Sequence, residues 1–259
     1  MVVIESLIFD NVTLKFGGIT ALNNVSFEVK PKKLYSIIGP NGAGKTSIFN
    51  CISGIYRPTS GTVSYGNNKI NELRPDEVAS LGIARTFQNI ELFENMTVID
   101  NILIGCHRQL NYGPVSSLLY SKKVKNSELE ARKIAEEIID FLEIEQFRYS
   151  YIMSLPYGVQ KRVELGRALA TEASLLLLDE PMAGMNVEEK REMCRFILEV
   201  NEEYGTTMVL IEHDMGVVMD ISDRVVVLDY GKIIGDGPPE EVRTNQNVID
   251  AYLGVSHGE

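Results

Sequence analysis

The 259-residue chain is long enough to bury a large core, as one domain or as a core with a subdomain. Its 44% apolar and 24% charged residues are those of an ordinary globular protein, and no apolar run approaches the roughly 18 residues that a membrane-spanning helix needs. A net charge of −11 argues against a broad nucleic-acid surface, because neutralising phosphates requires a basic patch.

The first third of the chain has the pattern of a sheet with one helix behind it. Residues 4–38 alternate apolar and polar side chains, as half-buried strands do. Leu34–Ile38 is predicted to be a buried strand, Thr46–Ile52 a helix, and Thr62–Tyr65 a further short strand. Val25, Phe27 and Val29 are predicted to lie on one face, with Ser26 and Glu28 on the other.

The stretch between the buried strand and the helix matches the phosphate-binding spacing G-x-x-x-x-G-K-[ST]. Glycines without a Cβ let backbone N–H groups approach phosphate oxygens, and the following helix points its N-terminus at the anion. Lys45 adds a positive charge toward the β- and γ-phosphates, and the Thr46 hydroxyl can bind Mg²⁺. The residues expected around the phosphates are Gly39, Pro40, Asn41, Gly42, Ala43, Gly44, Lys45, Thr46 and Ser47.

The middle of the chain, from about Thr97 to Ala170, is predicted to be mainly helical. Ser127–Glu130 has the form of a capping box, so we expect a helix to begin there. Residues of about 105–126 are expected to have weak structure. The amphipathic face behind the capping box is predicted to hold Ala131, Ile134, Ala135, Ile138 and Leu142.

The last third returns to alternating strands and helices, which predicts a largely parallel sheet and the α/β class. A helix over Val187–Tyr204 is predicted to end at Gly205, and its apolar face to hold Met193, Phe196, Ile197 and Val200. The remaining elements are expected to be strands at Thr207–Ile211 and Val225–Leu228, a hairpin turn at Gly231 and a final helix after Pro238 and Pro239.

Two acidic residues follow an apolar run in this last third. Leu175–Leu178 is predicted to be a buried strand that delivers Asp179 to the magnesium shell at its carboxyl end. Glu180 is then placed to polarise a water for attack on the γ-phosphate. A solvated turn is the alternative for an Asp-Glu pair alone, but the phosphate-binding loop upstream favours the functional interpretation.

Cysteine and histidine usage predicts neither a disulfide framework nor a metal cluster. The three cysteines form no C-x-x-C pair, so reduced and buried thiols in a cytosolic setting are expected. The three histidines lie far apart in the sequence. The first residues lack the basic and long apolar segments of a secretory signal, and we expect none.

Taken together and in order, these motifs resemble the nucleotide-binding subunits of ATP-binding-cassette (ABC) transporters over nearly the whole chain. The resemblance implies that Gln88 reaches Mg²⁺ and senses the γ-phosphate, that His213 bonds the γ-phosphate, and that Phe16 stacks on adenine. Taken alone, Phe16 and His213 would also fit structural roles. The family's signature sequence corresponds to the stretch that contains Leu155, Tyr157, Gly158 and Gln160, implied to contact nucleotide held by a second subunit.

The family fold implied by the resemblance is a P-loop NTPase core with a mixed or parallel sheet, an N-terminal antiparallel β layer and an inserted helical subdomain. Residues 1–259 would form a single ABC ATPase domain. Its nucleotide-binding core with the β layer would span about 1–90 and 171–259, and its helical subdomain about 91–170. The guanine-binding N-K-x-D pattern is absent from the sequence, which favours ATP over GTP.

The chain departs from the family's usual pattern in its signature and after the Asp-Glu pair, and within the signature Tyr157 takes the place of the first glycine and Val159 that of the glutamine. Pro156 stands where the signature Leu-Ser-Gly-Gly-Gln has its serine, so the hydroxyl that contacts the γ-phosphate is missing and this face should clamp ATP less well. Asn186 replaces the aspartate that most families carry after the Asp-Glu pair. The Tyr-Gly form of the signature, at Tyr157 and Gly158, and the Gly-x-Asn ending at Asn186 look most like the branched-chain amino-acid importer subunits.

The resemblance implies an ATP-hydrolysing subunit that powers an importer of branched-chain amino acids or a related small polar solute, with ATP and Mg²⁺ as cofactors. An exporter or lipid-transport cassette, or a soluble cassette acting on ribosomes or DNA, are the alternatives. Implied partners are transmembrane permease subunits, a second cassette subunit and an extracytoplasmic solute-binding protein, without nucleic acid. A paralogous second cassette is favoured because of Pro156, and a homodimer is the alternative. The implied location is the cytoplasmic face of the cell membrane.

Overall fold

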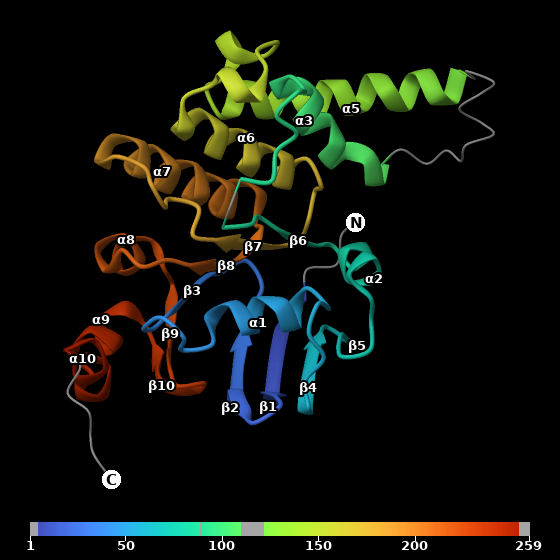
Figure 1. Cartoon of the computed structure of the whole chain (residues 1–259). Coiled ribbons are helices and arrows are strands. Elements are labelled where there is room, and N and C mark those ends of the chain that lie inside the picture. Colours follow the sequence, from blue (N-terminus) through green and yellow to red (C-terminus); the bar gives the residue numbers. More distant parts are fainter. Residues whose placement is uncertain (1–4, 89, 110–121, 254–259) are drawn as a thin grey trace. The chain divides into compact units, whose positions relative to one another are not determined.

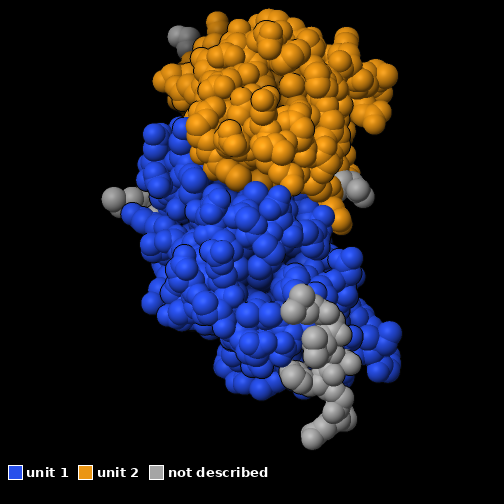
Figure 2. Space-filling view, turned by 90° about the vertical axis from the view of Figure 1, so that its left-hand side faces the viewer, with its two compact units in different colours: residues 1–85, 174–180, 197–259 blue, residues 86–173, 181–196 orange. Residues whose placement is uncertain are grey.

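The computed structural model describes residues 5–88, 90–109 and 122–253. The chain divides into two compact units, which Figure 2 colours separately. The core unit takes residues 1–85, 174–180 and 197–259, and the helical unit takes 86–173 and 181–196. Residues 181–196, which the sequence analysis assigned to the nucleotide-binding core, therefore lie in the helical unit. The expected α/β class with two sheets and helices is confirmed.

The first sheet of the core unit is an antiparallel layer with the strand order β2-β1-β4-β5 (Figure 1). The alternation predicted for its long strands is confirmed, because Val25, Phe27 and Val29 are buried and the residues between them are exposed. Its strands are β1 (Leu7–Phe16), β2 (Ile19–Val29), β4 (Ser60–Tyr65) and β5 (Asn68–Lys69).

The second sheet of the core unit has the order β10-β9-β3-β8-β7-β6 and is parallel except for the β9–β10 hairpin. Its inner strands are continuous apolar runs because helices and the other sheet bury both faces. The strands are β3 (Leu34–Ile38), β6 (Ile83–Arg85), β7 (Leu175–Asp179), β8 (Thr207–Ile211), β9 (Arg224–Asp229) and β10 (Lys232–Gly237).

Helix α1 (Lys45–Ile52) directly follows β3 and contributes to one apolar core with both sheets. Its Ile48, Phe49 and Ile52 are fully buried in that core. Each such side chain contributes about 1.5–3 kcal/mol by burial, so the start of α1 is held firmly at the end of β3. The other helices of the core unit are α2 (Pro75–Ser80), α8 (Met215–Ile221), α9 (Pro239–Thr244) and α10 (Gln246–Leu253).

The helical unit contains α3 (Val98–Gly105), α5 (Lys122–Phe141), α6 (Tyr157–Leu169) and the part of α7 (Val187–Tyr204) up to residue 196. Short 3₁₀ turns lie at Cys106–Gln109, Glu145–Phe147 and Ile152–Ser154. The predicted helix 187–204 is confirmed, and Gly205 follows it with a φ of 63°. Among the described helices, none has the length and apolar composition needed to cross a bilayer.

The predicted helix start at Ser127–Glu130 is wrong. Helix α5 begins at Lys122, so Ser127 lies inside it and does not cap its N-terminus. The side chain of Val124 is buried on the same face as Ala131, seven residues later, and this packing extends the helix beyond its local capping signal. The weak structure predicted for about 105–126 is wrong for the described parts, because 106–109 form a 3₁₀ turn and 122–126 belong to α5, and residues 110–121 lie outside the described residues.

Candidate active site

The loop from Gly39 to Gly44 leaves the carboxyl end of β3 in a conformation that favours glycine. Gly39, Gly42 and Gly44 have φ values of 148°, 81° and 108°. A Cβ added at Gly39 would lie 2.1 Å from the Leu228 carbonyl oxygen, and one at Gly44 would lie 2.7 Å from that of Ala21. Only glycine therefore lets this loop pack between β9 and β2.

Lys45 folds back over this loop. Its Nζ donates to the carbonyl oxygens of Gly39 at 2.6 Å and Pro40 at 3.1 Å. Burial lowers the pKa of the Lys45 ammonium, and the nearby carboxylates of Glu180 and Asp179 oppose that shift. A buried cation between two anions and a glycine loop is suited to a phosphate chain, whose oxygens can replace the carbonyl acceptors.

The acidic pair lies at the carboxyl end of β7, where the sequence predicted it. Asp179 is the last residue of β7 and is buried, with a residue exposure of 3%. Glu180 has a φ of 50°, and its N–H donates to the Ile211 carbonyl oxygen at 2.9 Å. A left-handed conformation costs a non-glycine residue about 1–2 kcal/mol, so the neighbouring strand β8 holds Glu180 in a strained position.

His213 contacts Glu180 directly. It follows β8 by two residues, and its Nε2 lies 2.7 Å from Glu180 Oε1. The His213 side chain is 46% exposed and that of Glu180 is 14% exposed. The Asp214 side chain accepts from Val217 N–H and caps α8, which fixes the turn that carries His213. The pair can therefore present one carboxylate oxygen and one imidazole to a substrate.

Arg85 is a site residue that the sequence analysis did not find. It ends β6, and its Nη2 donates to Asp179 Oδ2 at 2.7 Å. Its Nη1 donates to Asn50 Oδ1, also at 2.7 Å, and its guanidinium carbon lies 5.3 Å from the centre of the Phe49 ring. The only signal in the sequence was an arginine at the end of a short apolar run, which is not specific.

The donor set of the core unit fits a nucleotide phosphate chain with Mg²⁺. An added Cβ at Gly42 would meet nothing within 4 Å, so the outer side of the loop is open to a ligand. Thr46, in the first turn of α1, supplies an exposed hydroxyl, and Asp179 supplies a carboxylate. These hard oxygen donors are the kind that Mg²⁺ prefers.

Phe16 lies at the end of β1 and is 45% exposed. The ring packs edge-on against Tyr56, with centroids 5.0 Å apart. An exposed aromatic face that is held by a second ring can stack on a flat base. Adenine stacking at Phe16 stays a prediction.

The signature residues lie in the helical unit, at the start of α6. Pro156 is the N-cap residue of this helix, and its side chain forms no capping hydrogen bond. Gly158 is buried beneath Glu189, where an added Cβ would lie 2.3 Å from Oε1. Leu155 is buried, Tyr157 is 44% exposed, and Gln160 donates to the Leu155 carbonyl at 2.9 Å.

The Gln88 segment, also in the helical unit, is held by a buried ion pair of α6. Lys161 Nζ lies 3.2 Å from Glu164 Oε2 and donates to the Gln88 carbonyl at 3.3 Å. Glu164 Oε1 accepts from Phe87 N–H at 3.3 Å. Both charged residues are at most 3% exposed, and burial raises the pKa of the Glu164 carboxyl. The Gln88 backbone is thus fixed to the signature helix, and its side chain is exposed.

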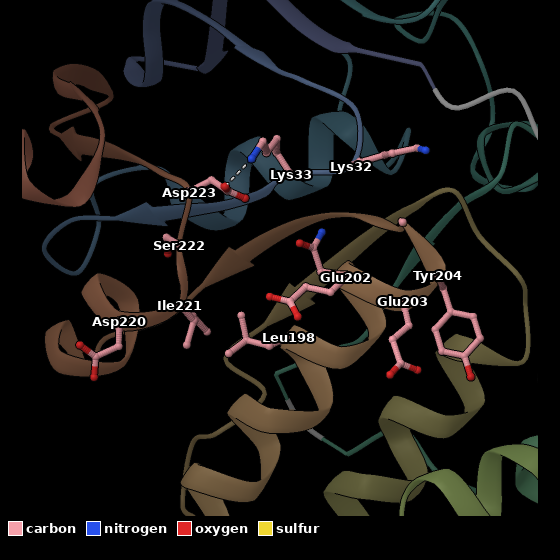
Figure 3. A pocket seen from close by; sticks show the side chains of 12 residues that line it. Lys32, Lys33, Leu198, Glu202, Glu203, Tyr204, Asp220, Ile221, Ser222 and Asp223 are labelled. Carbon is pink, nitrogen blue, oxygen red and sulfur yellow. Dashed lines mark hydrogen bonds and ion pairs between the residues drawn. The ribbon is translucent and has the colours of Figure 1, made fainter.

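The core unit also has a hollow of about 490 Å³ at the amino ends of β3 and β8 (Figure 3). Lys33 and Asp223 form an ion pair of 2.7 Å across part of its wall, and Glu202 and Asp220 add acidic groups. Ligands of open α/β sheets bind at the carboxyl ends of strands, where the glycine loop and Asp179 lie. This hollow is therefore not the nucleotide site.

In the core unit the fold brings together Lys45, Asp179, Glu180 and His213, which are far apart in the sequence. It adds Arg85 to them. Gln88 and the signature residues belong to the helical unit, so their part in the site stays a prediction. A cationic loop, a buried carboxylate and a second carboxylate held by an imidazole together fit the hydrolysis of a phosphoanhydride.

Comparisons with known proteins point in the same direction. A sequence model described as "ABC transporter" matches residues 22–183, and one described as "Branched-chain amino acid ATP-binding cassette transporter" matches residues 232–258. The high-affinity branched-chain amino acid transport ATP-binding protein LivG of Salmonella typhimurium is 41% identical over 248 residues. That match covers 96% of this chain and 97% of LivG.

Two solved structures resemble most of the chain. The ADP conformation of MJ1267, an ATP-binding cassette of an ABC transporter, has a TM-score of 0.83 at 32% identity, covering 97% of this chain and 100% of that one. The dimeric structure of MJ0796, a bacterial ABC transporter cassette, has a TM-score of 0.76 at 29% identity. It covers 90% of this chain and 98% of MJ0796.

Proposed function

This chain belongs to the ABC transporter family as an ATP-binding cassette, and from that premise we propose that it powers the import of branched-chain amino acids or of a related small polar solute. It is an ATPase subunit of a transporter. The observation that carries the choice of solute is its similarity to LivG along nearly the full length of both proteins.

The residues of the core unit have distinct roles in hydrolysis. Lys45 and the glycine loop bind the phosphates, because they offer a cation and backbone N–H groups at the end of β3. Glu180 accepts the proton of the attacking water, and His213 holds the Glu180 carboxylate and contacts the γ-phosphate. The strained backbone of Glu180 fixes the direction of that carboxylate.

The metal site is part of the proposal. Thr46, Asp179 and Gln88 are the residues that would hold Mg²⁺. When bound, Mg²⁺ neutralises charge on the phosphate oxygens. Asp179 is suited to this role because it is buried at the strand end and already fixed by Arg85.

The proposed partner assembly has two cassettes, each holding ATP between its own glycine loop and the other's signature. The dimeric MJ0796 cassette supports pairing in this fold. Because Pro156 has no hydroxyl and α6 has no side-chain cap, this chain offers a weak clamp to its partner's ATP. We therefore favour a paralogous second cassette with an intact signature serine.

The helical unit supplies the surface that we propose for the permease. Phe93 is 53% exposed, whereas Leu92 is buried and Met96 is half-buried. The neighbouring segment 149–153 hydrogen-bonds to Met96 and Val98 and exposes Tyr149, Tyr151 and Met153. Exposed apolar groups gathered on one unit are typical of a protein contact. Docking there would place the chain at the cytoplasmic face of the membrane, with a solute-binding protein on the far side.

Uptake measurements in cells that lack this chain test the proposed solute. Uptake of labelled leucine, isoleucine and valine should fall and return when the chain is supplied, whereas uptake of labelled arginine should not change. Normal branched-chain uptake with loss of another solute would overturn the choice of solute and keep the transport ATPase. Retention of all uptake would contradict import altogether.

A further inference from the structure

Arg85 is a buried cation that donates to partners on different elements of the core unit. Its side chain is 9% exposed, and that of Asp179 is 4% exposed. One arm of the guanidinium donates to Asp179 at the end of β7, and the other donates to Asn50 on α1. Phe49 packs against the guanidinium, which leaves little room for the side chain to move.

These two elements also carry the two core-unit residues that would hold Mg²⁺. Asn50 follows Thr46 by four residues on α1, so both side chains lie on the same face of that helix. Asp179 ends β7, the parallel neighbour of β6. Arg85 therefore spans the distance between the helix face of Thr46 and the carboxylate of Asp179.

Arginine suits this position better than lysine. Its planar fork can donate to two acceptors in fixed directions, whereas a lysine ammonium is a point charge on a flexible stem. A carboxylate that is held through one oxygen has the direction of its second oxygen fixed as well. Charge-assisted hydrogen bonds are also roughly twice as strong as neutral ones.

We propose that Arg85 is a positioning residue for magnesium-dependent ATP binding, which sets the Asp179 carboxylate relative to Thr46 through its bonds to Asp179 and Asn50. The inference rests on the proposed magnesium site. It opposes a simple charge argument, in which a cation beside the metal would repel it and its removal would tighten binding. Here the fixed geometry of the carboxylate outweighs that repulsion.

The experiment measures the dissociation constant of the purified chain for β,γ-imido-ATP by calorimetry, with excess Mg²⁺ and with EDTA. For the wild type, Mg²⁺ should tighten binding. In Arg85→Gln the ratio of the dissociation constant in EDTA to that in Mg²⁺ should fall about tenfold or more, which is the size expected for one charge-assisted bond. The dissociation constant in EDTA should change by less than about threefold. Arg85→Lys keeps the charge but loses the planar guanidinium, so its magnesium-dependent tightening should lie between that of the wild type and that of Arg85→Gln.

Two further variants separate positioning from general damage. Arg224→Gln removes another arginine of the core unit, paired with Asp236 at 2.6 Å, and should leave both constants unchanged. Asn50→Ala removes the second anchor and should reproduce part of the loss. Combined with Arg85→Gln, it should add nothing, because the two residues act through one contact.

The outcomes are distinguishable. A wild type without magnesium-dependent tightening would contradict the proposed magnesium site itself. If the wild type responds and both Arg85 variants keep its full response, or if Arg85→Gln binds more tightly with Mg²⁺, the positioning role is wrong. If Arg85→Gln does not fold, the Arg85→Lys and Asn50→Ala variants decide between these results.

Discussion

Glu180 and His213 show how local strain and tertiary contacts hold the groups that we propose to react. Glu180 has a left-handed backbone conformation, which costs a non-glycine residue about 1–2 kcal/mol of conformational free energy. The hydrogen bond to Ile211 and the contact with His213 hold it there. A rigid carboxylate directed at one point is what a general base requires.

Cysteine reactivity gives a residue-scale prediction with a defined pH dependence. Burial disfavours the thiolate and raises the pKa of Cys51 to about 12 and of Cys106 to about 11. Below those values the thiolate fraction rises about tenfold per pH unit, so alkylation of both by N-ethylmaleimide should be slow at pH 7 and accelerate steadily to pH 9.

Mass spectrometry of the alkylated chain checks this expectation. Cys194, which is only partly buried, should react first, and all three thiols should react quickly in denaturant. Modification of native Cys51 at the denatured rate, or a rate that levels off near pH 8, would contradict the buried environment.

At the residue scale, the sequence predicted those site residues that belong to spaced patterns. The glycine loop was found from its spacing, Asp179 and Glu180 from the apolar run before them, and His213 from the resemblance to ABC cassettes. Arg85 was missed because its role depends on Asp179 and Asn50, far from it in sequence, which only the parallel pairing of β6 with β7 brings near. The Lys161–Glu164 pair was missed because charged residues on a helix usually lie on its solvated face.

Helix α6 is the element that joins the signature to the Gln88 segment. In the buried Lys161–Glu164 pair, Glu164 accepts from the Phe87 N–H and Lys161 donates to the Gln88 carbonyl. Arg167 of the same helix donates to the Glu91 carbonyl. Motion of α6 would therefore move the whole segment with it. This connection gives a physical route between the signature and the surface proposed for the permease.

Removing the charge of only one member of the Lys161–Glu164 pair should destabilise the fold. Lys161→Met leaves the Glu164 carboxylate buried without its cation and should lower the free energy of unfolding by about 3–5 kcal/mol. Lys161→Met with Glu164→Gln removes both charges and keeps an acceptor for Phe87 N–H, so it should recover most of that loss. Urea unfolding measures both.

The single variant should also be sensitive to pH. Burial raises the pKa of Glu164 in the folded state above its ordinary value of 4.5. At pH values between 4.5 and this raised pKa, the folded state therefore binds more protons than the unfolded state. Stability of Lys161→Met should then fall as pH rises through that window and be partly restored at acid pH. A wild-type stability for Lys161→Met at pH 8 would contradict the buried pair.

Phe93 allows a test of the proposed permease surface. The buried Asn101 side chain accepts from Phe93 N–H at 2.9 Å and donates to its carbonyl at 3.1 Å, so the backbone is held while the ring is exposed. Phe93→Asp should therefore fold, keep its basal ATPase activity and lose most coupled transport. Leu129→Asp, at a 57% exposed residue of α5, is the matched control and should leave transport unchanged.

Reconstituted transport with purified components provides the measurement. Loss of folded protein in Phe93→Asp would show that the ring fills the core instead. Equal transport in both variants would place the permease contact elsewhere.

At the element scale, long periodic segments and strands were predictable from sequence, whereas one helix boundary was not. The helix Val187–Tyr204 and the strand Thr207–Ile211 agree with their predicted bounds because apolar spacing and Gly205 define them. The start of α5 was misplaced because the burial of Val124, a tertiary effect, outweighed a local capping signal.

The whole molecule is proposed to work in a pair, and Pro156 makes the pair unequal. The ATP on this chain's loop would face the partner's serine, whereas the partner's ATP would face Pro156. Purified alone with Glu180→Gln and ATP, this chain should remain monomeric by light scattering and dimerise when a cassette with an intact signature serine is added. A cooperative homodimer with two equivalent sites would contradict the heterodimer.

The most direct test of the transport ATPase uses the assembled transporter with this chain, its second cassette and the permease, and measures ATP hydrolysis, ATP binding and leucine uptake together. Glu180→Gln keeps the shape but removes the base, so hydrolysis should fall by about a hundredfold or more, uptake should stop, and bound ATP should persist. Lys45→Ala should instead weaken ATP binding itself. Hydrolysis by Glu180→Gln at the wild-type rate would contradict the catalytic role of Glu180.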